Sequence, residues 1–402
     1  MVKRVVVVGA GLSGLVCART LQRNGFETLV AEAAEGPGGR IRTDAFEGFL
    51  IDRGFQVYFE AYPHARQEFD LNRLEMKAYR RGALIYTGLG FKKLDAQRPL
   101  PTVLNPAFGY GDMVRLGLLA GNTLLGRTGV REQPTEHFLQ SAGFSDIALQ
   151  RFFRPFLGGI FLDPSLSTSS TQFSFLFKML LQGRVSTPAL GIGMLTQQVA
   201  DSLPNNSIHY NSTVKSVCSE GVTLGSGQTI GCDRVVLACD PPTTASLLQE
   251  PYRHGSLIST TLYFESTQPP IDEPFIALNG TGSGVVNLVA PLSVVSPQLA
   301  PPGKHLVAVT TFATASEEML IERVTEECKQ WFPDRAVPAW RYLKTVTVPF
   351  AQYRQNAGFR DLTPRLETAM PNVYRGGEIL TNSSIDGACE AGQLVAAEIS
   401  KG

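Results

Sequence analysis

The sequence predicts an α/β fold in which a parallel-sheet domain is interrupted by two long insertions. Three observations support this prediction: a run of four valines followed by a glycine-rich turn, a second glycine-rich loop near residue 38, and a third glycine-rich segment at residues 376–392. A chain of 402 residues is long enough for two or three domains. The segments that build the first domain are therefore expected to lie far apart in the sequence.

Composition and charge exclude several classes of protein. Hydrophobic residues make up 43% of the chain, and 36 basic side chains balance 36 acidic ones. A net charge of zero gives no general attraction for nucleic acid. The six scattered cysteines form no C-x-x-C pair, so neither a disulfide framework nor a metal site is expected, and a cytoplasmic compartment is favoured. No run reaches the roughly 18 apolar residues of a spanning helix, so any membrane contact is expected to be peripheral.

The first motif lies at residues 5–14. Residues 5–8 are valines typical of a buried parallel strand, and a helical pattern follows the turn. The turn carries the dinucleotide-binding fingerprint Gly9, Gly11 and Gly14. These glycines allow a tight turn, close approach of the backbone to a pyrophosphate, and close packing of helix on strand, in that order. The N-terminus of the helix, with Leu12 and Ser13, is expected to bind the phosphates through its free amide groups and its dipole.

A ribose-binding carboxylate is expected at Glu32. A second buried strand, residues 26–31, ends there, and Glu32 follows Gly14 by 18 residues, close to the usual spacing. Its carboxylate would accept hydrogen bonds from the adenosine ribose and would repel a 2′-phosphate. The order of strand, turn, helix, strand and acid predicts a Rossmann-type site in which FAD and NAD both remain open.

The loop after Glu32 carries Gly38, Gly39 and Arg40. This loop resembles the FAD-binding signature of the flavin amine oxidase, protoporphyrinogen oxidase and phytoene desaturase superfamily. The resemblance implies that FAD is the cofactor and that Arg40 contacts its pyrophosphate, for which a guanidinium fork is well suited. Residues 211–215 are similar to the family's middle segment, where the position of Val214 implies a backbone contact with adenine.

The C-terminal part is similar to the family as well, over residues 372–378 and 384–392. Glycine at 377 allows close backbone approach, and a carboxylate at 378 can accept from a ribityl hydroxyl. A helix is expected to begin near residue 387, and the resemblance places its N-terminal amides beside the flavin ring, where they would stabilise the reduced form. This segment supplies four further cofactor-binding candidates: Gly377, Glu378, Ser384 and Ile385.

Together these segments imply a discontinuous FAD-binding domain of the glutathione-reductase-like, amine-oxidase type. It would comprise residues 1–59, 183–244 and 369–402. An inserted α+β substrate domain would combine a helical part, 60–182, with a sheet-containing part, 245–368. In the second part, strands are expected around 259–264, 306–312 and 342–348, and a helix is expected around 317–331. No second nucleotide fingerprint is present, so a separate NADPH domain is not expected, and oxygen, a quinone or the substrate itself would receive the electrons.

The sequence indicates the substrate-binding residues less clearly than the cofactor-binding residues. Gln56 and Tyr58 lie in a loop that matches a family segment close to the flavin, and they are the substrate-side candidates, with solvated loop residues as the alternative. The first insertion is rich in phenylalanines that would line an apolar cavity or simply pack a core, namely Phe152, Phe153, Phe156, Phe161, Phe173, Phe175 and Phe177.

Two positions depart from the amine oxidases. Ser259 stands where the resemblance implies a lysine near the flavin, and Ser384 stands where it implies an aromatic that cages the amine. Both departures favour the desaturase and protoporphyrinogen oxidase members. The leading interpretation is an FAD-dependent oxidoreductase that removes a hydride from a hydrophobic small molecule. Amine oxidation, redox-neutral carotenoid isomerisation on reduced FAD and a non-catalytic FAD-binding regulatory role remain alternatives.

Overall fold

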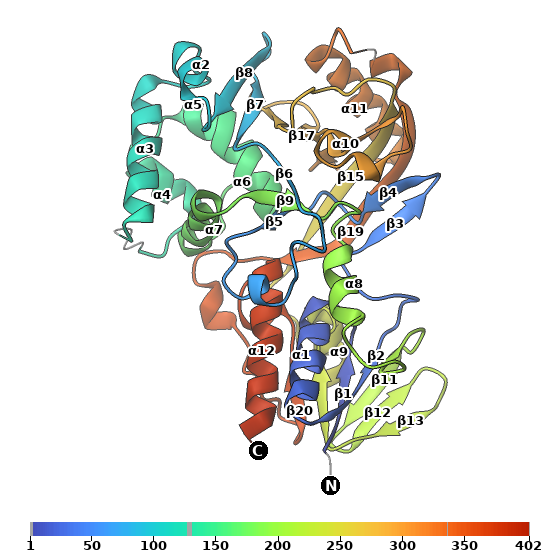
Figure 1. Ribbon diagram of the computed structural model, residues 1–402. Coiled ribbons are helices and arrows are strands. Elements are labelled where there is room, and N and C mark those ends of the chain that lie inside the picture. The colour runs from blue at the N-terminus through green and yellow to red at the C-terminus, as the bar shows by residue number, and fades with distance from the viewer. Residues whose placement is uncertain (1–2, 127–130, 336, 402) are drawn as a thin grey trace.

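The computed structural model describes residues 3–126, 131–335 and 337–401. One half of the molecule is built on a five-stranded parallel sheet in the order β10-β2-β1-β14-β20 (Figure 1). Its strands are β1 (Arg4–Val8), β2 (Glu27–Ala31), β10 (Ile208–His209), β14 (Arg234–Leu237) and β20 (Val373–Arg375). The predicted α/β class is confirmed, and this sheet is assembled from three distant parts of the chain.

Alternate valines of β1 explain the layers on the two faces of this sheet. Val5 and Val7 pack in one core with α1 (Leu12–Arg23) and α12 (Ile385–Lys401). Val6 and Val8 pack in another with a three-stranded antiparallel sheet. That sheet consists of β11 (Val214–Cys218), β12 (Gly221–Leu224) and β13 (Thr229–Gly231). All four valines are 5% exposed or less, as a strand covered on both faces requires.

The other half contains a seven-stranded sheet in the order β19-β15-β18-β17-β16-β7-β8. Its strands are β7 (Gly82–Tyr86), β8 (Phe91–Asp95), β15 (Ser256–Ser266), β16 (Ile276–Asn279), β17 (Val286–Ala290), β18 (His305–Thr311) and β19 (Arg341–Tyr353). Helix α11 (Glu317–Trp331), predicted at these residues, packs on one face through Val324 and Trp331. The opposite face packs against Phe152 and Phe156.

Helices gather beside this sheet (Figure 1). They are α2 (Pro99–Leu104), α3 (Tyr110–Leu124), α4 (Thr135–Ser141), α5 (Asp146–Ala148), a π-helical turn (Leu149–Phe153), α6 (Arg154–Phe161) and α7 (Ser170–Gln182). Two small sheets connect the halves: β3 (Thr43–Phe46) with β4 (Phe49–Asp52), and β5 (Tyr58–Phe59) and β6 (Lys77–Ala78) on either side of β9 (Val185–Thr187). Three further α-helices are α8 (Met194–Ala200), α9 (Pro241–Leu248) and α10 (Leu292–Val295).

The expectation that residues 60–182 are helical is incomplete. Strands β7 and β8 form a hairpin in this segment, and β7 pairs in parallel with β16 of the second insertion. The hairpin turn contains Gly88 and Gly90, both at positive φ, which side chains other than glycine adopt at a cost. The two insertions therefore share one sheet.

Candidate functional site

A cavity of about 1230 Å³ connects the two halves of the molecule. At one end it is lined by the carboxyl ends of β1 and β2 and by the N-terminus of α1. At the other end it is lined by α3, α6 and α7 together with strands of the seven-stranded sheet. Ligands of open parallel sheets usually bind at the carboxyl ends of the strands, as the first end of this cavity does.

The β1–α1 turn leaves the helix N-terminus open to this cavity. No side chain caps α1, so its first amide groups are available to an anion. A Cβ on Gly11 would meet no atom within 4 Å, and Gly11, Leu12 and Ser13 all line the cavity. Gly9 has a φ of +104°, and it too lines the cavity. The turn thus offers a phosphate both donors and space.

Gly14 lies behind the turn, away from the cavity wall. A Cβ at this position would lie 2.1 Å from the carbonyl oxygen of Gly9 and 3.2 Å from the Cβ of Ala238. The third glycine of the fingerprint therefore acts through helix packing, whereas Gly11 faces the cavity directly.

Glu32 is fixed at the end of β2 by two backbone amides. The amide of Ala10 donates to Oε2 at 2.6 Å, and the amide of Ala34 donates to Oε1 at 2.8 Å. Each carboxylate oxygen keeps a lone pair for a ligand hydroxyl. The amide of Ser212 donates to the backbone carbonyl of Glu32 at 2.7 Å, and this contact brings Val214 to the same wall of the cavity.

Arg40 and Glu378, two candidates from opposite ends of the chain, lie in direct contact. The guanidinium Nη2 of Arg40 is 2.6 Å from Oε1 of Glu378, whose side chain is only 6% exposed. Arg40 also donates to the carbonyl of Ala351 at 2.9 Å and lies over the ring of Phe350. Nothing in the sequence indicated this ion pair, because the two residues are separated by most of the chain.

The C-terminal candidates border the same region. Gly377, Glu378, Ser384 and Ile385 line the cavity, as do Gly38 and Gly39 from the loop after β2. The amide of Gly377 donates to Oγ of Ser13 at 3.1 Å, so the β20–α12 segment is tied directly to the start of α1. Oγ of Ser384 accepts from the amide of Gly387 at 2.9 Å and thereby caps the first turn of α12.

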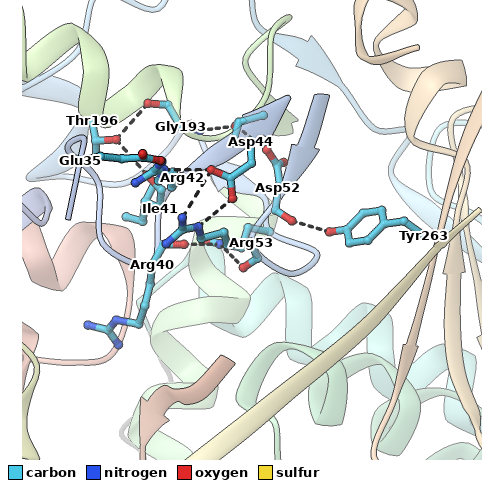
Figure 2. Close-up of polar contacts among 12 residues, drawn as sticks. Glu35, Arg40, Ile41, Arg42, Asp44, Asp52, Arg53, Gly193, Thr196 and Tyr263 are labelled. Atoms are coloured by element: carbon cyan, nitrogen blue, oxygen red, sulfur yellow. Dashed lines mark hydrogen bonds and ion pairs between the residues drawn. The ribbon is translucent and has the colours of Figure 1, made fainter. Parts of the chain in front are cut away.

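A network of charged side chains supports the loop that carries Arg40 (Figure 2). Asp44 accepts at 2.9 Å from both Arg42 and Arg53, while the guanidinium of Arg40 points away from this group. Burial opposes ionisation of Asp44, but the hydrogen bonds and charges of Arg53 and Arg42 hold its pKa below the ordinary value. These arginines are thus occupied within the protein.

Asp52 lies close to this network of charged side chains, but no cationic side chain pairs with it. Burial raises its pKa to about 6, although Thr43 Oγ1 and the amide of Ile192 both donate to Oδ1, at 2.6 and 3.0 Å. Both bonds go to Oδ1, which leaves Oδ2 able to hold a proton. The hydroxyl of Tyr263 donates to the backbone carbonyl of Asp52 at 2.8 Å, which anchors the loop to β15 (Figure 2).

The two substrate-side candidates behave differently. Gln56 lines the cavity, and its amide nitrogen donates to the carbonyls of Arg40 and Arg53 at 2.8 and 3.0 Å. Tyr58 is fully buried and packs edge-on against other aromatic rings, so the prediction that it contacts substrate is wrong. Successive side chains of a strand point to opposite sides, and at β5 Phe59 faces the cavity whereas Tyr58 faces the core.

The far end of the cavity is aromatic. All seven phenylalanines noted in the first insertion line it, and two pairs of them are stacked, Phe152 with Phe156 and Phe173 with Phe177. Sequence reasoning missed the contribution of α3, which adds Met113, Leu116 and Ala120. The available signal was that α3 carries apolar residues on more than one of its faces.

The strands of the seven-stranded sheet complete the wall. Ser259 on β15 lines the cavity beside Val348 of β19, with which it pairs. Among the described lining residues the cationic side chains are all arginines, Arg40, Arg53, Arg80 and Arg81, and none is a lysine. Within the same described ranges no group of three or more residues is arranged to hold a metal ion.

Comparison with known proteins adds a family match. A family model described as flavin containing amine oxidoreductase matches residues 12–400. A zeta-carotene-forming phytoene desaturase of Myxococcus xanthus is 46% identical over 52 residues, which are 13% of this chain and 10% of that protein. Coproporphyrinogen III oxidase of Propionibacterium freudenreichii subsp. freudenreichii is 24% identical over 310 residues, 61% of this chain and 58% of that protein.

The fold has counterparts among solved structures. An oxidoreductase from Methanosarcina mazei superposes with a TM-score of 0.78 at 20% identity, covering 98% of this chain and 100% of that one. This likeness concerns the fold. The matches to the two curated relatives span no more than 58% of either, so activity on a particular substrate does not follow from them.

Proposed function

The chain belongs to the family of flavin-containing amine oxidoreductases, and from this premise we propose that it removes a hydride from an apolar substrate held in the aromatic end of its cavity. Family membership makes it an FAD-dependent oxidoreductase and sets aside a non-catalytic role. Beyond family membership, we propose the class of substrate and the residues that bind FAD and substrate. The observation that supports it most directly is the wall of seven phenylalanines.

FAD fits the glycine-rich end of the cavity on structural grounds. The N-terminus of α1 is uncapped, and a side chain at Gly11 would project into open space. We assign the pyrophosphate to this terminus and to Arg40, and the ribose to Glu32. The full set of proposed FAD-binding residues that line the cavity is Gly9, Gly11, Leu12, Ser13, Glu32, Gly38, Gly39, Arg40, Val214, Gly377, Glu378, Ser384 and Ile385.

The chain's own residues orient and desolvate the reactants. Bound FAD supplies the two-electron acceptor. The stacked phenylalanines exclude water from the aromatic end and contact the apolar carbon atoms of the substrate. The substrate therefore loses little favourable free energy when it leaves a lipid or micellar environment. Uncharged polar groups on the wall, Gln56 and Ser259, offer hydrogen bonds without a cationic centre. The substrate would leave with one new double bond, having given up a hydride and a proton, and oxygen or a quinone would reoxidise the cofactor.

Amine oxidation is less well supported by this wall. The resemblance implies a lysine beside the flavin in amine oxidases, whereas Ser259 lies on the cavity wall and no described lining residue is a lysine. The aromatic that would help to cage an amine is replaced by Ser384, whose hydroxyl is engaged in capping α12. Both observations favour a substrate that carries no amino group.

Product analysis tests the proposal. The holoenzyme is incubated with a detergent-solubilised polyene, with a porphyrinogen and with a diamine, and the products are separated by chromatography and weighed by mass spectrometry. The expected result is loss of 2 Da or a multiple of it from one of the apolar substrates. Release of ammonia and peroxide from the diamine, with both apolar substrates unchanged, would contradict the proposal.

A further inference from the structure

Exposed apolar side chains are concentrated in one segment of the molecule, residues 87–126. Nine of the fifteen large hydrophobic side chains that the structure describes as exposed lie there. They belong to the β7–β8 turn, to α2 and to α3 with its C-cap, and they are Leu89, Leu100, Val103, Leu104, Tyr110, Val114, Leu118, Leu124 and Leu125. We call this set the α2–α3 surface. Apolar clusters of this kind on a folded protein mark interaction sites.

Helix α3 is apolar on both of its sides. Met113, Leu116 and Ala120 line the cavity. On the outside Tyr110, Val114 and Leu118 follow one another every four residues, and each is at least 60% exposed. A surface helix of a globular protein normally carries polar residues on its outer face. The outer face of α3 also exposes Arg115 and Asn122, but its three large apolar side chains suit it to an apolar environment.

The segment that carries this surface is basic in its exposed charges. Residues 87–126 contain four basic residues, Lys92, Lys93, Arg98 and Arg115, and two acidic ones, Asp95 and Asp112. Both carboxylates are buried, at 2% and 3% exposure. Lys92 donates to Asn105 just beyond the end of α2, and Arg98 is exposed directly before that helix. Lys93 is paired with Glu273, and Arg115 is exposed but lies 3.6 Å from the buried Asp112. Apolar side chains flanked by the cations Lys92, Arg98 and Arg115 match the boundary of an anionic bilayer, where lipid tails and negative headgroups meet.

We propose that the α2–α3 surface docks on an anionic phospholipid bilayer. None of the described helices is long and apolar enough to cross a membrane, and α3 has 15 residues where about 20 are needed, so the contact is peripheral. The inner side of the docked segment is the cavity wall, formed by Pro99 and Thr102 of α2 together with α3. Passage of an apolar substrate from the bilayer through this wall rests on the proposed function, whereas docking itself does not.

Vesicle co-sedimentation of the holoenzyme tests the proposal. Wild type is mixed with phosphatidylcholine vesicles with and without phosphatidylglycerol, and we expect stronger binding to the anionic vesicles. The triple variant Leu100→Ser, Leu104→Ser, Leu118→Ser is expected to bind about 1000-fold more weakly, since burial of one leucine contributes about tenfold. The matched control Met319→Ser, Leu362→Ser, Leu394→Ser changes exposed apolar residues elsewhere and should bind like wild type.

A second variant isolates the charges. Lys92→Gln, Arg98→Gln, Arg115→Gln should lower binding to anionic vesicles about 100-fold, since each cation near such a surface contributes about fivefold, and should leave binding to neutral vesicles unchanged. The flavin absorption of every variant confirms that it is folded.

Three results would overturn the proposal: wild type that does not sediment with anionic vesicles, a leucine variant that binds as well as wild type, or a wild-type dimer in sedimentation velocity that the leucine variant converts to monomer. The last would assign the surface to a second copy of the chain. Docking without turnover of any apolar substrate would instead contradict the proposed function alone.

Discussion

At the residue scale, the glycines of the β1–α1 turn have separable roles that two alanine variants should distinguish. In Gly11→Ala the new methyl meets no protein atom, so the apoprotein should melt within about 2 °C of wild type while FAD binds tenfold or more weakly. In Gly14→Ala the methyl lies 2.1 Å from the carbonyl oxygen of Gly9, so stability should fall by about 1–3 kcal/mol as well. Thermal melts of the apoproteins and FAD titrations check this. Equal melting temperatures for the two variants would contradict it.

Arg40 and Glu378 should be coupled energetically. Arg40→Met leaves a carboxylate of 6% exposure without its partner, so we expect a loss of about 3 kcal/mol in the free energy of unfolding together with weaker FAD binding. The double variant Arg40→Met, Glu378→Gln should recover much of the stability but not the FAD affinity. Urea unfolding of the two single variants and the double variant measures the coupling. Strictly additive losses would show that the ion pair contributes nothing.

Asp52 should make stability fall as pH rises. Its pKa is about 6 in the folded protein and near 3.8 when unfolded, so the folded state binds the extra proton between these values. This group's stabilising contribution is full below pH 4 and lost by about pH 7, a change of about 3 kcal/mol at most. Asp52→Asn keeps the Oδ1 acceptor for Thr43 and Ile192. Its stability relative to wild type should increase from pH 4.5 to pH 7.5 in urea unfolding, and a constant difference would contradict the assignment.

At the element scale, the contact between α1 and α12 positions the two cofactor segments relative to each other. A Cβ on Gly392 would lie 2.6 Å from the carbonyl oxygen of Ser13, so Gly392→Ala should push the helices apart. We expect a loss of about 1–3 kcal/mol in stability and weaker FAD binding, because Ser13 lines the cavity and accepts from Gly377. Glu398→Ala, near the exposed end of α12, is the matched control, and a similar loss there would contradict this explanation.

Sequence periodicity predicted the long elements well and the short ones poorly. The long elements contain enough residues for a period to be recognised. They are the valine strand β1, the helix of residues 317–331 and the strands around 259–264, 306–312 and 342–348. Strand β5 has only two residues, which is too few to show which side chain faces the cavity, and Tyr58 was consequently misplaced. The β7–β8 hairpin was missed because its partner β16 lies almost two hundred residues away.

Across the whole molecule, FAD is expected to contact segments that lie far apart in the sequence. The proposed cradle combines the β1–α1 turn, the loop at residues 38–40 and the segment at 377–385. Sequence motifs predicted each of these segments separately. A backbone that approaches a dinucleotide closely needs glycines at fixed positions, and these positions can be recognised in the sequence. No local sequence pattern predicted the ion pair of Arg40 with Glu378 or the network around Asp44. Both form only when the folded chain brings their residues together.

Hydride transfer from an apolar molecule to FAD, as proposed above, can be observed in the flavin itself. The most direct measurement is the visible absorption spectrum of the purified holoenzyme under anaerobic conditions, recorded before and after addition of a polyene, a porphyrinogen or an amine. We expect flavin bands that bleach with the polyene or the porphyrinogen and persist with the amine. A flavin reduced by the amine alone, or a colourless protein that cannot be reconstituted with FAD, would contradict it.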